Sequence, residues 1–154
     1  MLKVKPFSQT SGFCGPASLK MVLEYYGVNK SEKELARLCK HKISKGVSAE
    51  NILKAAKKLG MKGFIKDFSE ISDIKKYVIG KKIPVIVDWF SVDEGHYSVV
   101  IGIDKKNIYL QDPELGRIRT LGIGSFKRVW FDFLGDFLRS KNDIIIRRMI
   151  VIHK

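Results

Sequence analysis

The spacing of apolar residues changes near Pro84, and this change divides the chain into two halves of different secondary structure. Before Pro84, apolar residues recur roughly every three to four positions, which is typical of amphipathic helices. After it come short runs of β-branched and aromatic residues, bounded by glycine, lysine pairs and Asp-Pro, which is typical of strands. Helices that precede strands predict an α+β fold, with N-terminal helices packed on a C-terminal, mainly antiparallel sheet.

Capping residues indicate where the helices begin and end. Ser31 and Ser48 are suited to helix N-caps, and Gly27 and Gly60 are placed to end the helices before them. Glu34 completes a capping-box pattern with Ser31. The expected helices are 16–26, 31–39, 48–60 and 71–79, and the expected strands are 85–87, 97–103, 107–110 and 144–152.

The chain has 154 residues, which is close to the commonest size of a single domain. No repeat or proline-rich linker interrupts it, so we expect one domain over 1–154. No stretch approaches the roughly 18 uninterrupted apolar residues of a membrane helix, and the N-terminus lacks the apolar run of a secretory signal. We therefore expect no membrane span and a cytoplasmic location.

The formal net charge is +13, which raises the possibility of a nucleic-acid or anionic-membrane partner. The basic residues are spread along the chain instead of forming one arm, which favours a solvated lysine-rich surface. We expect no specific nucleic-acid partner. Such a surface would attract acidic peptide substrates.

Cys14 immediately precedes the first expected helix. A helix N-terminus carries unpaired N–H groups and a partial positive charge, which favour a thiolate and can hold a developing oxyanion. Gly15 lets a substrate approach the backbone, and Pro16 suits the first helical turn. A cysteine in this position can equally be a small buried hydrophobic residue. Gln9, five residues upstream, could supply a second oxyanion donor.

His96 begins an apolar strand, which would hold its ring rigidly, as a general base requires. Asp112 follows the next strand, and a hairpin turning near Asp104 would bring both residues to its open end. Asp112-Pro113 can also be a simple turn former. His41 and His153 are expected to be surface residues.

Cys39 ends a short helix with no nearby base, so a structural thiol is favoured. A disulfide to Cys14 is not expected in a reducing cytosol. The two cysteines and three histidines do not fall at the close spacing of a zinc site, so we expect no metal and no cofactor.

Gln9, Cys14-Gly15-Pro16-Ala17-Ser18, Gly95-His96-Tyr97 and Asp112-Pro113 together resemble the peptidases that remove double-glycine leaders from bacteriocins, and their free-standing relatives. Gly46-Val47-Ser48, the helix up to Leu59-Gly60 and Pro84-Val85-Ile86-Val87 resemble the spacer of that family. The resemblance implies a papain-like fold. It also implies that Cys14 is the nucleophile, His96 the base, Asp112 the group that orients His96, and Gln9 an oxyanion donor.

These residues predict a cysteine peptidase that hydrolyses a peptide or isopeptide bond through an acyl-enzyme. Two alternatives stay open. The same thioester chemistry serves acyl transfer to an amine, and the fold could also act as a catalytically silent peptide-binding domain. The expected partner is a peptide or protein substrate, and the sequence carries no signal of the oligomeric state.

Overall fold

The main sheet is antiparallel throughout, and its strand order is β1-β8-β2-β3-β4-β5. The computed structural model describes residues 1–154. The strands of this sheet are β1 (Lys62–Lys66), β2 (Val85–Ser91), β3 (Glu94–Ile103), β4 (Asn107–Asp112), β5 (Arg117–Gly122) and β8 (Arg148–His153). A second, two-stranded sheet contains β6 (Phe131–Phe133) and β7 (Ile144–Ile146).

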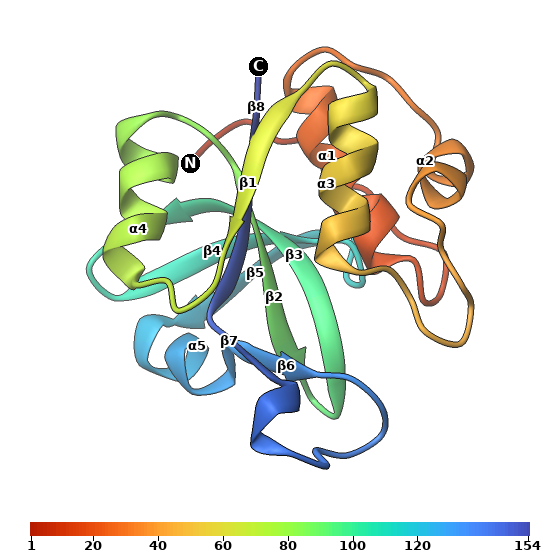
Figure 1. Cartoon of the computed structure of the whole chain (residues 1–154). Helices are drawn as coiled ribbons and strands as arrows, with labels where there is room; N and C mark the ends of the chain where they lie inside the picture. The colour runs from red at the N-terminus through yellow and green to blue at the C-terminus, as the bar shows by residue number, and fades with distance from the viewer.

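The helices lie on both faces of the main sheet (Figure 1). They are α1 (Cys14–Tyr25), α2 (Glu32–Leu38), α3 (Ala49–Lys58), α4 (Ile71–Lys75), the π-helical turn η1 (Lys76–Gly80), α5 (Ile123–Val129) and the 3-10 turn η2 (Lys141–Asp143). None of them has both the length and the apolar character needed to span a bilayer. The cytoplasmic location and the single-domain boundaries stay predictions.

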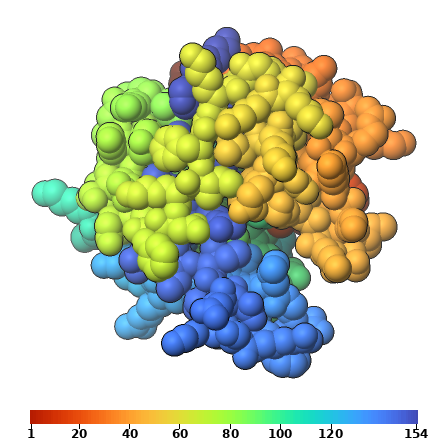
Figure 2. All heavy atoms as spheres, in the orientation of Figure 1, coloured from red at the N-terminus to blue at the C-terminus, as the bar shows by residue number.

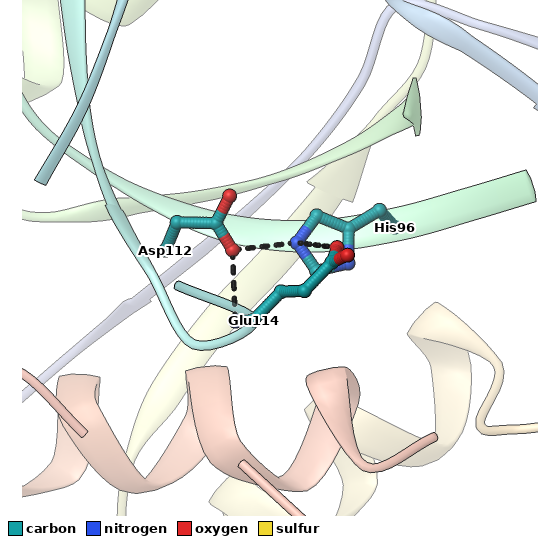
Figure 3. Close-up of side chains that lie close together, drawn as sticks. All are labelled: His96, Asp112 and Glu114. Atoms are coloured by element: carbon teal, nitrogen blue, oxygen red, sulfur yellow. Dashed lines mark hydrogen bonds and ion pairs between the residues drawn. The ribbon is translucent and has the colours of Figure 1, made fainter. Parts of the chain in front are cut away.

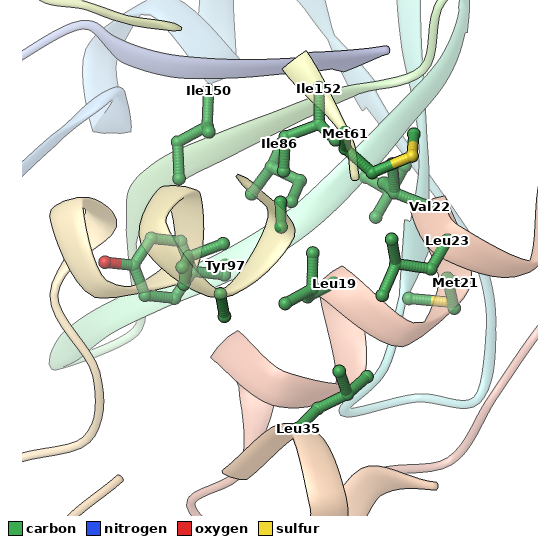
Figure 4. Packing of buried hydrophobic residues seen from close by; sticks show 14 of the residues in the cluster. Leu19, Met21, Val22, Leu23, Leu35, Met61, Ile86, Tyr97, Ile150 and Ile152 are labelled. Carbon is green, nitrogen blue, oxygen red and sulfur yellow. The ribbon is translucent and has the colours of Figure 1, made fainter. Parts of the chain in front are cut away.

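Alternation along the strands produces two buried clusters, one on each face of the sheet. On one face, Leu19 of α1 packs with Ile86 of β2 and Tyr97 of β3 (Figure 4). Ile52 of α3 and Val99 of β3 belong to the same cluster. On the other, Val100 of β3 packs with residues of α4, η1 and α5, including Phe126. The sheet is therefore covered on both sides, with α1 on the first face.

The capping residues act as the sequence predicts. The hydroxyl of Ser31 accepts a hydrogen bond from the Glu34 N–H at 3.1 Å, and that of Ser48 accepts one from the Asn51 N–H at 3.2 Å. Gly27 and Gly60 adopt φ values of 82° and 86° just after α1 and α3, a conformation that glycine adopts without strain. The predicted helices and the α+β class are confirmed.

Several elements, including α5 and β6, differ from the sequence-based expectation. The predicted strand 144–152 is two strands, because Arg147 has a φ of 47° and donates its backbone N–H to Trp130 O at 3.0 Å. Strand β5 was not predicted. Strand β1 was not predicted either, because its Gly63 weakens the strand signal; this glycine lies so close to the Val151 carbonyl that a Cβ would collide with it.

Candidate active site

Cys14 is the first residue of α1 and is partly exposed. The N-cap residue, Phe13, provides no side-chain acceptor, and the first turn contains no acidic residue. The N–H groups of that turn therefore stay available to a developing negative charge beside the sulfur. His41 supports this segment: its ring stacks on Phe13 with centroids 4.1 Å apart, and its Nε2 lies 3.0 Å from Gly12 O. His41 therefore contacts the nucleophile segment and is not a simple surface residue.

His96 lies near the start of β3 with only 4% of its surface exposed. Its Nε2 is 2.7 Å from Asp112 Oδ1, and the two residues come from adjacent strands whose register pairs Val99 with Gln111. Figure 3 shows the side chains of Asp112 and Glu114 both reaching the His96 ring, from the end of β4 and the turn after it. The structure thus brings together the two residues that the predicted hairpin was expected to place at one end.

Trp89 flanks the imidazole. It lies opposite His96 on β2, and the two rings meet edge to face with centroids 5.6 Å apart. Its indole N–H donates to Ser98 Oγ at 3.0 Å, which fixes the ring plane. Trp89 thus shields the His96–Asp112 pair from water.

Asp112 is buried but well supplied with donors. Arg119 of β5 donates its Nε–H to Oδ2 at 2.6 Å, and the Glu114 backbone N–H donates to Oδ1 at 3.0 Å. Burial alone would raise the pKa of Asp112, but the hydrogen bonds and charges of His96 and Arg119 lower it below its usual value. Asp112 is therefore a carboxylate at neutral pH.

Burial tends to lower the pKa of His96, but its contacts outweigh this effect. Hydrogen bonds to Asp112 and Cys14, together with their charges, raise the pKa of His96 to about 9. Because Nε2 faces Asp112, Nδ1 is the ring nitrogen left for the Cys14 sulfur. The arrangement can hold a thiolate and an imidazolium side by side.

Gln9 lies in the segment before α1. Its backbone N–H donates to Pro113 O at 2.9 Å, which ties this segment to the turn after Asp112. Its side-chain carbonyl oxygen is buried without a hydrogen-bond partner. The oxyanion role of Gln9 stays a prediction.

Tyr97 connects the sheet to the helical side of the site. Its hydroxyl donates to Val47 O at 2.9 Å, and a Cβ on Gly15 would lie 3.5 Å from its ring. In Figure 2 a hollow separates the orange and yellow atoms of the N-terminal helices from the blue C-terminal segments, with green atoms of the middle strands at its floor. A side chain at Gly15 would crowd Val47, because its Cβ would lie 3.2 Å from the Val47 Cβ.

One group of side chains has spacing suited to a metal ion: His96, Asp112 and Glu114 offer ligand atoms within 4.8 Å of one another. The facing atoms of His96 and Asp112 are already hydrogen-bonded, and Arg119 places a positive charge on Asp112. The group is suited to holding a proton on the imidazole, and it does not suit a cation.

Cys39 is fully buried at the end of α2, and burial raises the pKa of its thiol to about 12. It is free, as is Cys14. This environment agrees with a structural thiol.

Solved structures of similar fold share this architecture. The peptidase domain of Streptococcus ComA, a bifunctional ABC transporter involved in quorum sensing, aligns with a TM-score of 0.75 and 23% identity over 97% of this chain and 98% of that domain. A protein described as a C39-like peptidase from Bacillus anthracis aligns with a TM-score of 0.76 and 18% identity over 99% and 95%. A double-glycine-motif protease from an AMS/PCAT transporter, solved in complex with the leader peptide, aligns with a TM-score of 0.74 and 24% identity over 99% of this chain and 92% of that chain. The fold is that of a papain-like cysteine peptidase domain.

The sequence places the chain more closely within this class. The Peptidase C39 family profile matches residues 6–134, and the chain therefore belongs to the Peptidase C39 family. Two relatives are uncharacterized proteins of Methanothermobacter marburgensis and Methanothermobacter thermautotrophicus. They are 39% and 38% identical over 72% and 76% of this chain, and the matches cover 72% and 75% of the relatives. The resemblance seen in the sequence is confirmed at the level of family and fold.

Proposed function

We propose that this protein is a cysteine peptidase in which Cys14 attacks the peptide bond, His96 transfers the proton and Asp112 orients His96. The observation that carries the proposal is the buried His96 ring, whose Nε2 lies 2.7 Å from Asp112 Oδ1 and whose pKa is raised by the neighbouring Asp112 and Cys14. Membership in a peptidase family supports it. The substrate is a peptide, in keeping with the leader peptide bound by the double-glycine-motif protease.

The reaction begins with the thiolate of Cys14 attacking the carbonyl carbon. The oxyanion is stabilised by the Cys14 N–H at the start of α1 and by the side-chain amide of Gln9. The imidazolium of His96 then protonates the leaving amine as the thioester forms. In the second half, His96 removes a proton from water, which attacks the thioester and releases the acid. An amine in place of water would give acyl transfer.

The test is labelling with a thiol-reactive peptide probe, followed by mapping of the modified residue. We expect one adduct, on Cys14, in the wild type and in Cys39→Ala, because Cys39 is buried and its thiol stays protonated. Cys14→Ala should lose both labelling and peptide hydrolysis. Full hydrolysis by Cys14→Ala would contradict the proposal.

A further inference from the structure

Two acidic side chains meet on the sheet side of the site. Asp88 of β2 is 2% exposed and pairs across the sheet with Tyr97 of β3. Asp132 of β6 is partly exposed, and its carboxylate lies so close to Gly95 that a Cβ there would collide with both oxygens. Gly95 and Tyr97 are two residues apart on β3 and share one face of the sheet, so the Asp132 carboxylate lies on the face that carries Asp88. We call these two residues the acidic pair.

The acidic pair lacks a full set of donors. Asp88 Oδ1 is buried and has no hydrogen-bond partner. Arg148, which pairs with Asp88 across the sheet, is engaged elsewhere: it binds Asp67 through two hydrogen bonds of 2.7 and 3.0 Å and lies 3.6 Å from Glu50. A buried carboxylate oxygen without a donor is costly unless a ligand or a proton satisfies it.

The surroundings of Asp88 disfavour its charged form. Burial and the contact with Asp132 raise the pKa of Asp88 well above its usual value, and the charge of Arg148 offsets this only in part. A cation placed between the two carboxyls would counteract both effects, because it stabilises the ionised form.

The acidic pair also borders the nucleophile. A Cβ on Gly15, the neighbour of Cys14, would lie 3.5 Å from the Tyr97 ring, and Tyr97 pairs with Asp88 across the sheet. Gly95, against which Asp132 lies, directly precedes His96. Because Asp132 is partly exposed, a substrate group can reach the pair from solvent.

We propose that Asp88 and Asp132 form a subsite for a cationic substrate side chain, a lysine ammonium or an arginine guanidinium, carried within about two residues of the scissile bond. This inference rests on the proposed peptidase function, which defines the bond that is cut. When the cation binds, both carboxylates contact it. The subsite selects a basic residue, although the net charge of +13 favours acidic peptides on the surface as a whole.

The local charge can be tested without peptide hydrolysis. We would measure the rates at which Cys14 reacts with aminoethyl, methyl and sulfonatoethyl methanethiosulfonate, which are cationic, neutral and anionic. Each reagent transfers its alkylthio group to the Cys14 sulfur, which forms a mixed disulfide, and methanesulfinate is released. The rate for each reagent is divided by the rate at which the same reagent reacts with 2-mercaptoethanol, which removes differences in intrinsic reactivity. We expect the cationic reagent to react about fivefold faster than the neutral one, and the anionic reagent to be slowest.

Removal of the acidic pair should abolish this order. In Asp88→Asn/Asp132→Asn the cationic-to-neutral ratio should fall to about one, whereas Asp93→Asn/Asp136→Asn, which removes two exposed carboxylates, should keep the wild-type ratio. The single variant Asp88→Asn retains Asp132 and should give an intermediate ratio, so the test survives poor folding of the double variant. A wild-type ratio of one, or a ratio unaffected by these variants, would overturn the subsite.

Peptide cleavage separates the subsite from the peptidase activity. We would compare kcat/KM for peptides with lysine or norleucine at one position at a time around the scissile bond. We expect about a tenfold preference for lysine at one position, reduced in Asp88→Asn and lost in Asp88→Asn/Asp132→Asn. Equal cleavage of every pair would overturn the subsite and leave the peptidase proposal intact. Failure of Cys14 to react with any reagent or peptide would overturn both.

Discussion

Two buried aspartates, Asp112 and Asp88, flank the Cys14–His96 contact, and their surroundings differ sharply. Both are almost inaccessible, at 1% and 2% exposed. Asp112 accepts hydrogen bonds from His96, Arg119 and the Glu114 backbone N–H, and its pKa is lowered. Asp88 contacts another carboxyl, its Oδ1 has no partner, and its pKa is raised.

The comparison shows that donors, and not burial, decide the charge of a carboxyl group in this site. The Asp112 side is complete within the protein: every charge there has a partner. The Asp88 side is incomplete, because Oδ1 of Asp88 has no partner there. In the function that we propose, the Asp112 side supports the chemistry and the Asp88 side recognises the substrate.

The largest effect should come from the complete side. Asp112→Asn keeps the shape of the side chain but removes the charge that stabilises the His96 imidazolium. We expect kcat/KM for peptide hydrolysis to fall about 10³-fold or more. The loss of activity at high pH, which follows the pKa of His96 at about 9, should move to lower pH. Measured pH profiles would check both points, with exposed Asp93→Asn as the control. A profile unchanged in position would contradict the role of Asp112.

Stability should respond in opposite directions at the two sites. Asp112→Asn leaves Arg119 and His96 without their carboxylate, and we expect unfolding to become easier by about 2–4 kcal/mol. Asp88→Asn removes a poorly satisfied acid, so a change of less than about 1 kcal/mol, or a gain, is expected. Urea denaturation at neutral pH would measure both values. Equal losses in the two variants would break the comparison.

The pH dependence of stability gives a sharper form of that test. A lowered pKa, as at Asp112, contributes stability above the unfolded value of about 4, and this contribution is lost as pH falls through the folded value. The raised pKa of Asp88 does the reverse: stability is lost as pH rises above about 4. Relative to the wild type, Asp88→Asn should therefore gain stability between about pH 4 and 7, while Asp112→Asn loses it.

A smaller effect is expected at Arg119, which acts through Asp112 and is a positioning residue. Arg119→Gln removes the 2.6 Å hydrogen bond and the guanidinium over the Trp89 ring, 5.6 Å from its centroid. We expect kcat/KM to fall about tenfold. The high-pH limb of the kcat/KM profile should shift to higher pH, because loss of a positive charge near His96 raises the pKa of His96. Arg119→Lys keeps the positive charge, so it should restore the position of the high-pH limb more fully than it restores kcat/KM. If the limb does not shift in Arg119→Gln, Arg119 has a purely structural role.

Much of the complete side could be predicted from the sequence. Cys14 before a helix, His96 at the start of a strand and Asp112 after the next strand are local signals, and one hairpin suffices to bring the last two together. Arg119 was missed because strand β5 was missed, although Arg117-Ile118-Arg119 alternates as a strand does.

The incomplete side could not be predicted in the same way. Asp88 is a single charge in the apolar run 85–90, and nothing local says whether its side chain is satisfied. Its partner Asp132 belongs to a short strand that packs near the β2–β3 hairpin, through stacking of Phe131 and Phe133 on Phe90. Such a contact depends on tertiary packing between distant segments, for which hydrophobic periodicity gives no signal.

The position of β8 in the sheet has a consequence for the order in which this protein matures. Strand β8 pairs with β1 on one side and β2 on the other, so β1 joins the β2–β5 part of the sheet only when residues 148–153 are in place. During synthesis, the sulfur, the imidazole and its carboxylate all leave the ribosome before this segment. The six-stranded sheet can therefore form only after all three of these side chains have been synthesised.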